Sequence, residues 1–68
     1  MSSVARVTEI SAESPTSFDD AVRVGIERAA STLRNLRSAY VKEQQVMIDA
    51  SGSKRTYQVN LLITFVLE

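Results

Sequence analysis

The sequence predicts an α+β fold in which one long helix packs on a three-stranded antiparallel sheet. Three observations lead to this prediction. Apolar residues alternate near both ends of the chain, recur at helical spacing between them, and a short turn around Gly52 separates the last two alternating segments. The order is therefore strand, helix, strand, strand, and a helix on one sheet face is the simplest way to bury the apolar sides.

The first strand is predicted over residues 4–10 (VARVTEI), which alternate and are rich in β-branched side chains. A small, polar segment follows, and we expect it to form a loop. Two helix starts are open. Ser17 with Asp20 three residues later has the form of a capping box, whereas Ser14 before Pro15 offers a cap with proline at the first helical position.

The helix itself is predicted to run for about five turns, because apolar residues recur at steps of three and four from Phe18 to Leu36. Gly25 lies within this stripe, where it costs about 1 kcal/mol relative to alanine, so it indicates a close approach by a neighbouring element. Arg34 and Arg37 would then lie in the last turn, where positive charge suits the helix dipole.

The second and third strands are predicted over residues 40–49 and 56–68, joined as a hairpin. Val41 and Val46 are separated by an odd number of residues, so strict alternation places them on opposite faces. Two interpretations are open: either Val41 lies on the other face, or a bulge near residues 43–45 brings both valines to the same face.

The size of the chain favours association. Residues 1–68 are expected to form a single domain, and a chain this short buries only about 60% of the surface that its unfolded form exposes. Without cysteine or histidine it cannot form disulfides or the usual zinc sites, which leaves oligomerisation as the means of stabilisation. Leu62 and Val66 are predicted to point away from the helix, where only a neighbouring subunit would cover these apolar side chains.

Composition excludes several classes of function. The formal charge is zero, so nucleic acid is not expected as a partner. No apolar run has the length of a signal peptide or a membrane span, and we expect a soluble cytoplasmic protein. The chain lacks a histidine base, a cysteine nucleophile and a glycine-rich phosphate loop, which predicts a protein that is not an enzyme.

Two groups of polar residues remain as candidate ligand-binding groups. Amides on the two strands of the hairpin can donate to and accept from a planar heterocycle or another subunit, or they simply face solvent; they are Gln44, Gln45, Gln58 and Asn60. Carboxylates suit a divalent cation such as calcium if the symmetry of an oligomer gathers several copies, and otherwise form charged surface; the candidates are Glu9, Glu43 and Asp49.

Several phrases of the sequence resemble the dodecins, a family of small flavin-binding proteins. They are ERAASTLRNLR at residues 27–37, VKEQ at 41–44 and TYQVNLLITFVLE at 56–68, with VTEISAESPTSFDDAV at 7–22 fitting the same pattern. The resemblance covers nearly the whole chain. It implies a β-α-β-β subunit, a hollow homododecamer, and flavin storage or sequestration rather than catalysis, with the flavins stacked on a tryptophan and hydrogen-bonded by a glutamine.

Carried over to this chain, the family's glutamine is Gln58 and the position of its tryptophan is Ser38; the chain contains no tryptophan. Tyr40 lies two residues further, on the same side of a regular strand. Either Tyr40 restores part of the stacking surface, or Ser38 and Tyr40 line a subunit contact. The resemblance thus predicts a non-enzymatic homododecamer that binds FMN or riboflavin at Gln58, Ser38, Tyr40, Gln44 and Gln45. The alternative is a structural or calcium-type shell without flavin.

Overall fold

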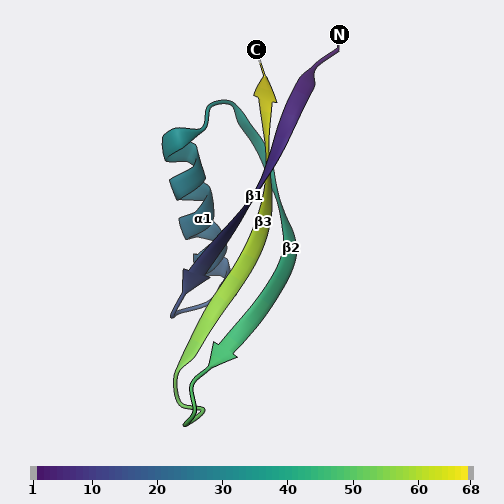
Figure 1. Cartoon of the computed structure of the whole chain (residues 1–68). Coiled ribbons are helices and arrows are strands. Elements are labelled where there is room, and N and C mark those ends of the chain that lie inside the picture. Colours follow the sequence, from purple (N-terminus) through teal and green to yellow (C-terminus); the bar gives the residue numbers. More distant parts are fainter. Residues whose placement is uncertain (1, 68) are drawn as a thin grey trace.

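The fold has the predicted β-α-β-β order. The computed structural model describes residues 2–67, and Figure 1 shows the helix lying along one face of an elongated sheet. The chain measures 54 Å along its longest axis. The sheet order is β1-β3-β2, and both neighbouring pairs are antiparallel. The elements are β1 (Val4–Ser14), α1 (Phe18–Thr32), β2 (Leu36–Ile48) and β3 (Arg55–Leu67). The predicted end of the last strand at Glu68 lies outside the described residues.

The core forms where α1 crosses the central strand, β3. Alternating residues of β3 that are at most 1% exposed face buried small residues of α1 spaced four apart; they are Val59, Leu61 and Ile63 on the strand, and Ala21, Gly25 and Ala29 on the helix. A Cβ atom at Gly25 would lie only 2.9 Å from Leu61 Cδ1 and 3.1 Å from Ala12 Cβ. The close approach predicted at this glycine is therefore confirmed.

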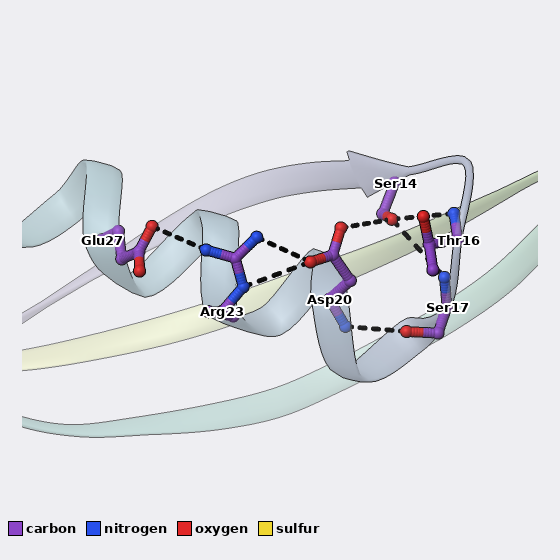
Figure 2. Close-up of polar contacts among 6 residues, drawn as sticks. All are labelled: Ser14, Thr16, Ser17, Asp20, Arg23 and Glu27. Atoms are coloured by element: carbon purple, nitrogen blue, oxygen red, sulfur yellow. Dashed lines mark hydrogen bonds and ion pairs between the residues drawn. The ribbon is translucent and has the colours of Figure 1, made fainter.

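The helix begins after Ser17, which confirms one of the two predicted starts. The Ser17 Oγ accepts a hydrogen bond from the backbone N–H of Asp20 at 3.0 Å, as an N-cap does. Figure 2 shows that the other candidate, Ser14, supports the same turn from the end of β1: its buried hydroxyl donates to Asp20 Oδ2 at 2.7 Å and accepts from the N–H of Thr16. The loop is thus fastened to the first turn of the helix.

The Asp20 carboxylate connects this cap to the exposed side of α1. Arg23 donates to Asp20 Oδ1 at 2.7 Å and to Glu27 at 3.0 Å, so a chain of ion pairs runs along the helix surface (Figure 2). The Ser14 hydroxyl, followed by Arg23, lowers the pKa of Asp20 below its ordinary value. The ionised form of Asp20 is therefore the one that stabilises the helix start.

The first strand is longer than predicted. It continues past residue 10 to Ser14, so the expected loop over residues 11–14 is wrong. The reason is tertiary: Ala12 lies opposite Val59 and Ser14 lies opposite Tyr57, so pairing with β3 holds these small residues in the sheet despite their weak strand preference.

The helix is shorter than predicted. It ends at Thr32 with Leu33 as its C-cap, so Arg34 and Arg37 lie beyond it and the expectation that they occupy its last turn is wrong. Asn35 adopts φ 60°, a left-handed conformation that asparagine tolerates, and its carbonyl accepts from Val66 N at 3.0 Å. The chain then enters β2 directly. Across residues 2–67, α1 included, no helix has the length and apolar character needed to cross a membrane.

The second strand contains a bulge, which decides between the two interpretations that the sequence left open. The register shifts between Val41 and Glu43, which leaves Lys42 as the extra residue, just before the predicted position at 43–45. Val41 then lies opposite Leu61, and Val46 lies opposite Tyr57. Since these two β3 residues share the helix side of the sheet, the bulge brings both valines to that side.

Candidate functional site

The sheet face turned away from α1 carries most of the polar candidates, and we call it the open face. On β3 it is formed by the residues that alternate with the buried core. Their partners in the register extend this face over β1 and β2. The open-face residues that concern the site are Gln58, Asn60, Leu62 and Thr64 of β3, Ser11 and Glu9 of β1, and Ser38, Tyr40, Glu43 and Gln45 of β2.

Four of the five predicted ligand-binding residues share this face. Gln45 lies opposite Gln58, Tyr40 lies opposite Leu62, and Ser38 lies opposite Thr64. The fifth, Gln44, lies opposite buried Val59 and therefore belongs to the helix side of the sheet. The bulge at Lys42 decides this division, because it resets the alternation of every residue that follows it in β2.

The four residues extend along the sheet. Leu62 and Gln58, which lie opposite Tyr40 and Gln45, are four residues apart on β3, a separation of about 13 Å on a regular strand. Tyr40 is 65% exposed, so its ring is available as a flat surface. The arrangement offers an aromatic ring at one end and a pair of amides at the other.

Glu9 is the first of the three carboxylates considered as cation ligands, and its two oxygens already have partners. Lys42 donates to Oε1 at 3.2 Å, and Asn60 Nδ2 donates to Oε2 at 3.2 Å. These contacts, the bond from Asn60 first, lower the pKa of Glu9. Sequence reasoning missed this cluster, because Lys42 reaches Glu9 across the central strand and only the register of the sheet brings the two together.

The other two carboxylates lie apart from each other. Glu43 lies opposite Asn60 on the open face, whereas Asp49 lies in the hairpin loop. The backbone N–H of Lys54 lowers the pKa of Asp49, and Ser51 also donates to its carboxylate at 3.0 Å. Within the described residues no three acidic, histidine or cysteine side chains gather into a metal-binding group. The three candidate carboxylates therefore do not come together within the described part of one chain.

Two hollows at the molecular surface lie on the helix side. One, of about 570 Å³, lies between α1 and β1 and is lined by Ile10, Val24 and Leu33 among others. The other, of about 260 Å³, lies between α1 and the start of β2, and Ser38 is among its lining residues. Neither of these two hollows includes Gln58 or Tyr40.

Comparison with known proteins agrees with the resemblance seen in the sequence. A model of the Dodecin family matches residues 4–68. Calcium dodecin from Mycobacterium tuberculosis is 36% identical over 63 residues, which cover 93% of this chain and 87% of that protein. The dodecin structure from Streptomyces coelicolor is 38% identical with a TM-score of 0.89, covering 97% of this chain and 93% of that one. The dodecin from Streptomyces davaonensis is 35% identical with a TM-score of 0.91, covering 100% and 98%.

Family match, sequence identity and fold therefore agree over nearly the full length of the chain. Sequence identities of 36% and 38% indicate common ancestry and not merely a shared fold. The matches cover 93% and 97% of this chain, so no large segment is left unmatched. This chain belongs to the dodecin family.

Proposed function

We propose that this protein is a non-enzymatic homododecamer of single-domain subunits (residues 1–68) that binds and stores a flavin-type ligand, FMN or riboflavin, in the cytoplasm. The observation that carries the proposal is that Ser38, Tyr40, Gln45 and Gln58 share the open face of the sheet. These four residues are the proposed contacts of the ligand.

The chemistry of the open face suits a planar heterocycle. Paired amides at Gln45 and Gln58 can both donate to and accept from the edge of such a ring. Stacking on an aromatic side chain contributes about 1 to 3 kcal/mol by analogy with nucleobases, which a serine at position 38 does not supply. The loss amounts to about one to two decades of affinity, and we propose that exposed Tyr40 restores part of it.

Association also follows from the surface of the single chain. Large apolar side chains stay exposed on β1, β2 and the helix, including Val7, Ile26, Tyr40, Val41 and Ile48. Both β1 and β2 are edge strands with unpaired backbone groups. Burial of these edges and side chains against further copies would stabilise the subunit and cover the open face, and membership of the dodecin family points to a shell of such copies.

A flavin titration tests the proposal. Adding the apoprotein to riboflavin or FMN should quench the flavin fluorescence at micromolar protein. Substituting Gln58→Leu should weaken binding by about two- to tenfold, the effect of one hydrogen bond. The matched control is Gln44→Leu, which removes an amide from the opposite face and should leave affinity unchanged. Absence of quenching by the unmodified protein would remove flavin as the ligand.

A second candidate function is a structural shell that binds a divalent cation. It is favoured by the 36% identical relative named calcium dodecin. In this chain the carboxylates of Glu43 and Asp49, and Glu9 if it left its present partners, would be brought together by symmetry. Thermal unfolding in calcium, magnesium and chelator discriminates the two candidates: a calcium-dependent rise in the melting temperature supports this function, and indifference to all three solutions contradicts it.

A further inference from the structure

Two amides on the central strand point the same way across the open face. Gln58 Nε2 donates to the Oγ of Ser11 at 2.8 Å, and Asn60 Nδ2 donates to Oε2 of Glu9 at 3.2 Å. Both acceptors belong to β1, the neighbour of β3 on one side. In each amide the nitrogen is therefore the atom bonded to β1, and the amide oxygen takes no part in that contact.

The orientation of Asn60 is chemically dictated. A serine hydroxyl can donate or accept, so Ser11 alone does not fix the amide of Gln58. The ionised carboxylate of Glu9 can only accept, so the group of Asn60 that faces it must be the nitrogen. Lys42 donates to the other carboxylate oxygen at 3.2 Å, so both oxygens of Glu9 have partners.

We infer that Glu9 is a positioning residue for ligand recognition: through its bond to Asn60 it presents Asn60 Oδ1 beside Gln58 as a hydrogen-bond acceptor for a ring N–H. This inference rests on the proposed function and deepens it. It adds Asn60 to the ligand contacts and identifies a ring N–H as the ligand group that is recognised. Neither role follows from the sequence motif that identifies Gln58.

The chemical consequence is a preference for ligands with an N–H donor on the edge that meets β3. The pyrimidine edge of a flavin carries such a donor at N3, between two carbonyl groups. A ring methylated at N3 lacks this donor. The amide oxygen that Asn60 presents beside Gln58 would then have no hydrogen-bond partner on the ring. One lost neutral hydrogen bond corresponds to about two- to tenfold in affinity.

The test compares lumiflavin with 3-methyllumiflavin, each titrated with the assembled protein while flavin fluorescence is followed. The quantity of interest is the ratio of the two dissociation constants, because any steric effect of the methyl group is common to all variants. Glu9→Gln replaces the acceptor-only carboxylate by a group that can donate or accept. Glu43→Gln is the matched control, since Glu43 lies opposite Asn60 and carries the same charge but makes no hydrogen bond to it.

The inference predicts that the unmodified protein prefers lumiflavin, and that Glu9→Gln and Asn60→Leu each reduce the preference by about two- to tenfold. Glu43→Gln should retain it. Equal effects of the Glu9 and Glu43 variants, or a preference that survives Asn60→Leu, would overturn the inference while leaving flavin binding intact. If the unmodified protein quenches neither compound, the flavin proposal fails and this inference fails with it.

A second readout separates positioning from a general effect on folding. In the ligand-free protein, the side-chain amide resonances of Asn60 should shift on Glu9→Gln and stay in place on Glu43→Gln, with both variants retaining the mass of the assembly. Asn60 resonances that ignore Glu9→Gln would show that the carboxylate does not hold the amide, and would overturn the inference without reference to any ligand.

Discussion

Substituting Gly25→Ala tests how closely α1 packs on the sheet. An added Cβ would meet Leu61 Cδ1 at 2.9 Å and Ala12 Cβ at 3.1 Å, both shorter than ordinary van der Waals contact. The end of the leucine side chain can shift, but Ala12 is fixed to the backbone of β1. Overpacking of this kind costs about 1 to 3 kcal/mol, whereas replacing a helical glycine by alanine gains about 1 kcal/mol.

The two effects leave a net destabilisation of about 1 kcal/mol. We would measure it by urea unfolding followed by circular dichroism at one fixed protein concentration, because association makes the midpoint depend on concentration. Ala30→Gly provides the matched control: this exposed helical site lacks the contact, so the substitution should report the helix preference alone, a loss of about 1 kcal/mol. A Gly25→Ala protein more stable than the parent by that amount would refute the packing argument.

Three further predictions concern the ligand face, the helix start and the core. Ser38→Trp should tighten flavin binding by about one to two decades in a fluorescence titration; unchanged affinity would place stacking elsewhere. The pKa of Asp20 is lowered in the folded chain, so its stabilising effect is present above the unfolded-state pKa and is lost as the pH falls through the lower folded value. Asp20→Asn should therefore flatten the acid side of the stability profile in chemical denaturation, whereas Asp19→Asn should not; identical profiles for the two variants would contradict the role of Asp20. Leu61→Ala should cost about 2 to 5 kcal/mol in urea unfolding because Leu61 is fully buried, and half-exposed Leu67→Ala should cost far less; similar losses would contradict the placement of the core.

The buried side of β3 and the close packing at Gly25 could be predicted from the sequence, because both depend on local periodicity. Alternation along β3 identified its buried side, and the odd spacing of Val41 and Val46 left room for the bulge that the register confirms. Gly25 was readable because a glycine inside an apolar helical stripe is costly unless a neighbour needs the space.

The end of the helix was not readable from the same periodicity. Leu33 and Leu36 continue the spacing of the helical stripe, yet both serve equally well as core contacts of an extended chain. The decision lies in tertiary contacts: Asn35 takes a left-handed conformation and its carbonyl pairs with Val66 from the last strand. Contacts of this kind, distant in sequence, carry no local signal.

The candidate site was readable only as far as alternation holds. Tyr40 and Ser38 were assigned to one side on spacing alone, and the register agrees. Alternation places Gln44 and Gln45 on different faces, but which of them lies on the open face depends on where the bulge lies. The bond from Lys42 to Glu9 spans the whole sheet, so it depends on the order β1-β3-β2.

Native mass spectrometry of the protein purified from its own cells tests the central claim most directly, because it reports subunit number and retained ligand together. The proposed dodecamer of 7.5 kDa chains should appear at about 90 kDa, with additional mass from bound flavin that dissociates on activation. A species at 7.5 kDa, without larger assemblies, would contradict both the shell and the ligand site that it covers.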